Sequence, residues 1–460
     1  MKTKIYINAM LVICGLLLLS GCKKDFLDKK PATNLDVPTT LSDLQLLLDN
    51  TQNIYRSPAL GEVSADDYYM TYAQWSTQYT PYFANAYVWN KDVFAGQGKI
   101  SDWDMPYTQV LYTNVVLQQL QNITRNSSNS ANYDNIKGAA LFMRAWAFFD
   151  LAQVFTLPYD SNTASSDPGI PLRLTADINA PSVRATVKAT YDQILADVIQ
   201  SGSLLSNNTS LVFQNRPSKA SVYGLLSRVY LSMRNYPLAG LFADSALQLQ
   251  HKLIDYNMVD TTTIAPFNLS NDETVYQNLT VNADPLSYVE FSQGYSIDTL
   301  LYQSYAKNDL RKVVYFAING PDINKKFGYS GGGTLSNGIA TDELYLTRAE
   351  CYARANNNTN ALADLNTLLS KRWRTGTYVP FSNLQGVALL DTILMERRKE
   401  LLMRCLRWND IRRLNKEGFN ITPERILNGK TYQLQPNSPL YALPIPPDVI
   451  ALSGIQQNNR

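Results

Sequence analysis

The sequence offers few residues of the kinds that carry catalysis. Asp66 and Asp67 are the most suggestive carboxylates, because they lie in a stretch rich in aromatic residues. A glycosidase needs two carboxylates that face one bond at a defined separation, which adjacent residues do not indicate. The chain contains one histidine, His251. A zinc site of several histidines is therefore excluded, and a histidine-based triad would have to centre on His251. We expect no enzymatic activity.

The glycine run Gly331–Gly333 does not indicate a nucleotide site. It lacks the Lys-Ser/Thr pair of a phosphate-binding loop, and no clear strand-loop-helix pattern surrounds it. Together with Phe327 and Tyr329, the run would suit a mobile rim. No spacing fits a calcium loop either, so we expect no cofactor.

Aromatic residues are concentrated just after Asp66. Nine of them lie within 24 residues, namely Tyr68, Tyr69, Tyr72, Trp75, Tyr79, Tyr82, Phe83, Tyr87 and Trp89. Tyr and Trp present a flat apolar face with a polar edge, which stacks on the C–H face of a sugar ring and also suits peptides. The alternative is that these side chains pack a loop onto the scaffold.

A second aromatic group is Tyr295, Tyr302 and Tyr305, for which core packing is the favoured interpretation, although Tyr295 is retained as a candidate. Trp103, Tyr107 and Tyr112 are expected in the core. The predicted ligand-binding candidates are Tyr68, Tyr69, Tyr72, Trp75, Tyr79, Tyr82 and Tyr295.

The N-terminus has the pattern of a lipoprotein signal peptide. Lys2 and Lys4 precede an apolar stretch that ends in Leu19-Ser20-Gly21-Cys22. We expect residues 1–21 to be removed and Cys22 to carry the lipid, with residues 22–40 as a tether. No later apolar run is long enough to span a membrane, so the lipid is the one expected membrane attachment.

The charge balance argues against nucleic acid. Removal of Lys2 and Lys4 with the signal peptide leaves 39 basic and 39 acidic residues, so the mature chain is neutral. Of the four cysteines, Cys14 leaves with the signal peptide and Cys22 is the anchor. Cys351 and Cys405 remain, either as a disulfide or as two buried free thiols.

Helical periodicity dominates the rest of the chain. Residues 137–155 are apolar nearly all round, as in a buried helix, and 186–200 are amphipathic. Residues 219–250 have the signature of a tetratricopeptide-like helix pair, with Ala239 nine residues after Tyr230. The spacing recurs with Tyr352 and Ala361 in 342–370. Because 122 residues separate the two units, the sequence predicts helix pairs interrupted by long insertions.

The insertions are expected at 61–107 and 255–340, which are rich in polar residues and tyrosine and include a β-like run at 312–316. Residues 391–414 are predicted to form one long charged helix, with Glu400 and Arg404 as a surface pair. Its charges favour a structural ion-pair network over a ligand clamp. The segment 440–452 is expected to be extended because of its prolines.

Several segments, taken together and in order, resemble the SusD/RagB family. These are FLDKKP (26–31), DPGIPLR (167–173), NDLRK (308–312), TRAECYAR (347–354), ERRKEL and LRWNDIRR (396–413), PIPPDVI (444–450) and Gln457-Asn458. One departure is Met403-Arg404-Cys405, where the family usually has aromatic-Glu-Gly. The ion pair of that Glu must therefore differ here. A second departure is the end of the chain, QQNNR.

The resemblance implies a mostly α-helical SusD-like fold, in which tetratricopeptide-like helix pairs form a scaffold with long loop-rich insertions. It implies one domain over 41–460, with an N-terminal part at about 41–250 and a C-terminal part at about 251–460. It also implies an outer-membrane lipoprotein that faces outward and passes an oligosaccharide to a SusC-like TonB-dependent transporter. Import of peptides and a pure protein-interaction scaffold are the alternatives.

Overall fold

The computed structural model describes residues 38–207, 212–286 and 294–460, and Thr40–Arg460 form one unit. The predicted signal peptide, Cys22 and all but the end of the tether lie outside the described residues. Of the helices in the described ranges, none has the length and apolar composition needed to cross a membrane.

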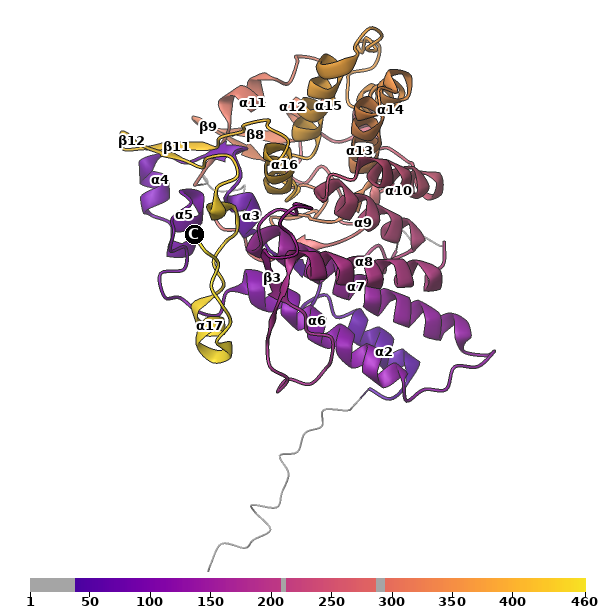
Figure 1. The fold of residues 1–460 in the computed structure, drawn as a ribbon. Coiled ribbons are helices and arrows are strands. Elements are labelled where there is room, and N and C mark those ends of the chain that lie inside the picture. The colour runs from indigo at the N-terminus through magenta and orange to yellow at the C-terminus, as the bar shows by residue number, and fades with distance from the viewer. Residues whose placement is uncertain (1–37, 208–211, 287–293) are drawn as a thin grey trace, which may run out of the picture. The chain divides into compact units, whose positions relative to one another are not determined.

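Helices packed side by side form the N-terminal part of the scaffold (Figure 1). They are α2 (Leu41–Leu48), α6 (Ser101–Leu120), α7 (Ser130–Phe155) and α8 (Val187–Leu204). A capping box between Thr40 and Asp43 starts α2, and Thr186 caps α8. From Gly138 to Phe155 every residue of α7 is buried, so the predicted buried helix is confirmed and begins one to two turns earlier than expected.

Two helix pairs continue this scaffold. They are α9 (Lys219–Ser232) with α10 (Tyr236–Leu249), and α13 (Thr341–Arg354) with α14 (Asn358–Ser370). Asn235 caps α10 and Asn357 caps α14 in the same way, so the two turns are equivalent. A methyl group on Gly240 would lie only 2.8 Å from Cys351 Cβ, which shows how closely α10 packs on α13. The predicted pairs are thus confirmed, and they stack directly despite the insertion between them (Figure 1).

The insertions contain short elements in place of continuous loops. The helices are α3 (Leu60–Val63), α4 (Tyr72–Ser76), α5 (Pro81–Tyr87), η2 (Tyr256–Met258), α11 (Thr299–Gln303) and α12 (Arg311–Val314). The strand pairs are β1 (Arg56–Ser57) with β6 (Leu279–Thr280), β2 (Tyr68–Tyr69) with β7 (Ser296–Ile297), β5 (Thr274–Tyr276) with β10 (Ile339–Ala340), and β8 (Phe316–Asn319) with β9 (Asp322–Lys325). The β-like prediction for 312–316 is wrong, because most of that run lies in α12.

Outside the insertions, β3 (Pro168–Pro171) pairs with β4 (Arg184–Thr186), and β11 (Glu424–Leu427) pairs with β12 (Lys430–Gln433). The proline-rich end is less extended than predicted. It forms η3 (Pro439–Tyr441) and α17 (Pro447–Ser453), because a proline within the first turn does not interrupt a helix.

The charged segment is not one helix. It forms α15 (Gly386–Glu400) and α16 (Arg407–Asn415), and the intervening turn holds Met403 and Cys405 at φ of 54° and 59°. These left-handed conformations end the helical path, so the predicted pair of Glu400 with Arg404 is wrong. Cys351 and Cys405 are both free thiols, which answers the open question of a disulfide.

Candidate functional site

The aromatic stretch divides into a buried and an exposed set. Tyr68, Phe83, Tyr87 and Trp89 are buried, Trp75 and Tyr82 are half-buried, and Tyr69, Tyr72 and Tyr79 are exposed. Trp103 is in the core, as predicted, while Tyr107 and Tyr112 are half-buried. Both expected roles, packing and exposure, therefore occur within one short stretch.

Tyr68 and Tyr295 pack inside the protein. They are 1% and 0% exposed, and their rings meet edge to face at 5.7 Å. The Tyr68 hydroxyl donates to the Val63 carbonyl at 2.6 Å, and the Tyr295 hydroxyl accepts the Lys325 amide N–H at 3.2 Å. Direct ligand contact by these two residues is at odds with this burial, so we correct their assignment to packing residues.

Tyr69, Tyr72, Trp75 and Tyr79 together form what we call the aromatic surface, over β2 and α4. Tyr69, Tyr72 and Tyr79 are 39%, 49% and 93% exposed. The Trp75 indole N–H donates to the Ala84 carbonyl at 2.9 Å, and its ring lies 5.9 Å from that of Tyr72. The indole is therefore held in place without a ligand, which lowers the entropy cost of stacking on it.

Helix α4 is itself anchored at both the local and the tertiary level. Thr71 and Gln74 form a capping box at its start. The Gln74 side chain also donates to Asp322 of β9 at 3.2 Å, across 248 residues of sequence. The aromatic surface thus sits on a helix tied to the β8–β9 hairpin.

A cavity of about 460 Å³ lies where β1, β6, the start of α6 and the glycine run meet, and we call it the polar cavity. It is lined by Arg56, Ser101, Met105, Thr280, Val281, Asn282, Gly333 and Thr334. All of these except Arg56 lie in the predicted insertions 61–107 and 255–340, and Gly333 also belongs to the glycine run. No residue spacing marks the individual positions, so the sequence indicated the segments but not the lining residues.

Tyr82 is half-buried, and its ring packs against those of Phe83 and Phe94. Burial raises the pKa of its hydroxyl, and the carboxylates of Asp102 and Asp284 raise it further. Ser101 and Asn282, which line the cavity, are next to or near these carboxylates in sequence. None of the predicted ligand-binding candidates, however, is among the residues that line the polar cavity.

The pair Asp66 and Asp67 has a structural role. Arg407 donates to Asp66 at 2.6 Å, and Arg398 donates to Asp67 at 2.8 Å. Burial raises the pKa of Asp67, whereas for Asp66 the effect of burial is overcome by Arg407 and Arg398, which hold its pKa low. Both carboxylates are directed at arginines of the charged segment, so they do not face a shared substrate bond.

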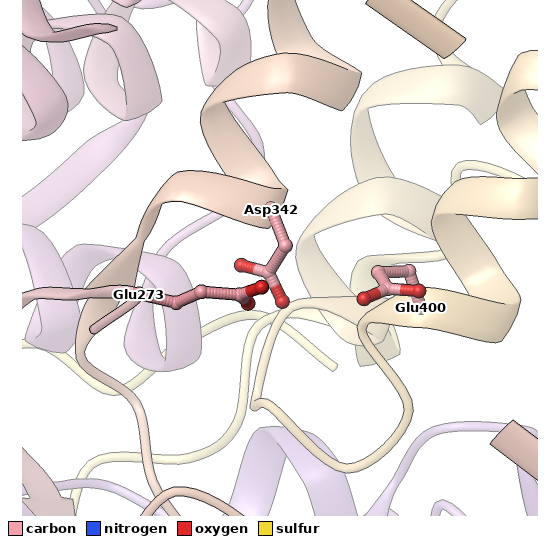
Figure 2. Close-up of side chains that lie close together, drawn as sticks. All are labelled: Glu273, Asp342 and Glu400. Atoms are coloured by element: carbon pink, nitrogen blue, oxygen red, sulfur yellow. The ribbon is translucent and has the colours of Figure 1, made fainter. Parts of the chain in front are cut away.

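Glu273, Asp342 and Glu400 form a buried carboxylate group whose oxygens lie within 4.8 Å of one another (Figure 2). Arg372 donates to Glu273 at 2.7 Å and to Glu400 at 2.6 Å. Arg404 donates to Asp342 at 3.3 Å. Because arginines already supply the positive charge, this donor set does not fit a metal ion. Burial raises the pKa of Asp342 to about 7.

Family comparisons agree over nearly the whole chain. Residues 25–231 match the SusD-like family described as starch-binding and associating with the outer membrane, and residues 245–459 match the SusD family. The chain belongs to the SusD/RagB family. No curated protein is significantly similar to it in sequence.

Solved structures of this family share the fold. A SusD superfamily protein from Bacteroides thetaiotaomicron is 23% identical with a TM-score of 0.74, and the match covers 92% of this chain and 100% of that one. A SusD-like carbohydrate binding protein from Bacteroides vulgatus is 20% identical, with a TM-score of 0.66 and coverage of 90% and 97%. A laminarin binding SusD-like protein is 17% identical, with a TM-score of 0.64 and coverage of 91% and 98%.

The arginine-rich motif of the SusD/RagB family forms buried ion pairs in this chain. Arg397 donates to Asp410 at 2.9 Å, and Arg413 donates to Glu350 of the TRAECYAR helix at 2.6 Å. Two motifs of the family thus meet in one buried ion-pair network. The structural role of the charged segment was predicted, whereas its meeting with the TRAECYAR helix was not. At the departure from the motif, Arg404 turns inward to Asp342.

Proposed function

We propose that this chain is a cell-surface lipoprotein that captures a glycan and passes it to a SusC-like TonB-dependent transporter in the outer membrane. Cys22 would carry the lipid after removal of residues 1–21, and the domain would face the cell exterior. Family membership supports this role, as do carbohydrate-binding and laminarin-binding proteins with the same fold.

The observation that carries the proposal is the aromatic surface. Tyr72 and Tyr79 present their rings to solvent and Trp75 is partly exposed, although burying a large aromatic side chain is worth about 1.5–3 kcal/mol. A sugar ring would cover these faces with its C–H groups, while its hydroxyls would bond to polar groups nearby. The polar cavity would bind a further sugar residue of the same glycan.

Binding without hydrolysis is the activity that the site supports. The adjacent carboxylates Asp66 and Asp67 are each engaged by an arginine of the charged segment, so neither is directed at a bound ligand. The protein would therefore hand on its ligand intact.

Affinity electrophoresis of the folded protein in gels containing different polysaccharides tests glycan capture. We expect slowed migration in at least one gel, with no release of reducing sugar on prolonged incubation. Release of sugar would show an enzyme. Migration unchanged in every gel, together with binding to immobilised peptides, would support the peptide alternative in its place.

The transporter partnership requires a separate experiment in the native membrane. Tagged full-length protein should co-purify with a large outer-membrane barrel, and Cys22→Ala should lose most of it. A preparation without any barrel would contradict the transport role and would leave a free-standing binder or scaffold.

A further inference from the structure

Arg56 occupies an unusual position in the wall of the polar cavity. It lies on β1 and is half-buried. Within the described part of the chain, its side chain forms one hydrogen bond, a long one from Nη1 to the Thr280 carbonyl at 3.5 Å. Among the described residues, Arg56 is the one partly buried arginine with neither an ion pair nor a shorter hydrogen bond. Most of its donors therefore remain available within a cavity of about 460 Å³.

The contrast with other arginines shows that this is not a general property of the protein. Arg311 contacts Asp309, Glu396 and Glu400, and Arg144 holds Asp197 through two bonds of 2.7 Å. The fold thus supplies carboxylates to these structural arginines and backbone carbonyls to others, such as Arg412. A guanidinium loses hydration on partial burial and gains most from an anionic partner that accepts two parallel N–H bonds.

Two carboxylates that contact the chain at or just after β1 are already engaged. Asp102 accepts the amide N–H groups of Ala59 and Leu60 at 2.7 and 2.8 Å. Asp150 accepts the Ser57 hydroxyl and the Asn337 side chain. Neither forms an ion pair with Arg56, and within the described part of the chain no salt bridge of up to 4.0 Å joins a carboxylate to its guanidinium.

We infer that Arg56 binds an acidic group on the glycan, either the carboxylate of a uronic acid or a sulfate ester, within the polar cavity. This inference rests on the proposed capture function and narrows its substrate class to acidic glycans. Ser101, Asn282 and Thr334 line the same cavity and offer polar partners for the neighbouring hydroxyls of that sugar.

Matched acidic and neutral polymers test the inference by isothermal titration calorimetry on the mature domain. The pairs are polygalacturonate with its carboxyl-reduced form, and dextran sulfate with dextran. We expect the wild type to bind at least one acidic polymer about tenfold or more tightly than its neutral counterpart. The polymer that does so distinguishes carboxylate from sulfate.

Arg56→Gln should abolish that difference while the neutral polymers bind as before, and Arg56→Lys should restore part of it by keeping the charge without the planar fork. Arg374→Gln, at an exposed arginine, is the control for general charge attraction and should change nothing. An unchanged thermal midpoint of each variant verifies folding.

Equal affinity of the wild type for both members of each pair would overturn the inference, as would a preference retained by Arg56→Gln. In either case, binding to neutral glycans would leave the proposed function intact. Failure to bind any glycan, acidic or neutral, would overturn the capture function and this inference together.

Discussion

The charged segment Glu396–Arg413 and the aromatic stretch Tyr68–Trp89 differ in a way that reverses expectation from composition. In the charged segment most of the acidic and basic side chains are buried, and they hold distant parts of the chain together. In the aromatic stretch several large rings remain exposed, although each carries a large apolar face that could be buried.

The charged segment fixes the structure of the fold, whereas the aromatic stretch leaves surface exposed for binding. Arg398 and Arg407 of the charged segment pair with Asp67 and Asp66, directly before the aromatic stretch. The charged segment therefore positions the base of the aromatic stretch. The exposed rings beyond that base make few contacts of their own and remain open to a ligand.

Breaking the charged segment should have the largest effect. Glu400 accepts from Arg372 at 2.6 Å and from Arg311 at 3.0 Å with no exposure of its side chain. Glu400→Gln removes the charge but keeps the shape, and should lower the free energy of unfolding by about 3–5 kcal/mol, because it removes the buried negative charge that Arg311 and Arg372 share. Urea unfolding followed by tryptophan fluorescence measures this.

Glu424→Gln is the matched control, at an exposed strand position where the side chain accepts one bond from Gln433. Its unfolding midpoint should equal that of the wild type. A Glu400→Gln protein as stable as the control would show that the buried network does not stabilise the fold.

The pH dependence of stability tests a buried charge on β9, outside both the charged segment and the aromatic stretch. Lys325 is 7% exposed, and burial lowers its pKa to about 7 from an ordinary 10.5. Between these values the unfolded chain binds the extra proton, so the contribution of Lys325 to stability rises with pH and is lost as pH falls through about 7.

Relative to Lys325→Met, the wild type should therefore gain on the order of 2 kcal/mol between pH 7.5 and 9. Urea midpoints of both proteins across this range give the difference directly, and other titrating groups cancel in it. A constant difference would mean that Lys325 keeps its charge in the folded protein.

The scaffold could be predicted from the sequence because its signals are local. The apolar run of α7 and the spacing of Tyr230 with Ala239 each report on one helix or one pair. The charged segment could not be predicted in the same way. Its break depends on left-handed Met403 and Cys405, and the partners of Glu400 lie at positions 311 and 372.

The candidate site was predicted only in part for a related reason. The aromatic stretch has no regular period, so its sequence does not say that Tyr68 turns inward while Tyr69 turns outward. That division arises because β2 pairs with β7, and neighbouring residues of a strand point to opposite sides. Arg56 gave no local signal in the sequence, because what distinguishes it in the described part of the chain is the absence of an ion-pair partner.

On the binding side of the comparison, Trp75→Ala should weaken glycan binding about tenfold, which corresponds to about 1.4 kcal/mol, through loss of the stacking face. Leu452→Ala removes an exposed apolar side chain from α17 and serves as the control. Affinity electrophoresis in the best polysaccharide gel measures both. Equal retardation of a folded Trp75→Ala protein would remove Trp75 from the site.

The smallest expected effect separates two tyrosines within the aromatic stretch. The Tyr68 hydroxyl donates to the buried Val63 carbonyl at 2.6 Å, whereas Tyr79 is 93% exposed. Tyr68→Phe leaves that carbonyl without its donor and should lower the free energy of unfolding by about 1 kcal/mol, with glycan affinity unchanged. Tyr79→Phe should leave stability unchanged, because water already satisfies its hydroxyl. If Tyr68→Phe weakened binding without lowering stability, Tyr68 would belong with the exposed rings, and the division between packing and binding residues would have to be drawn elsewhere.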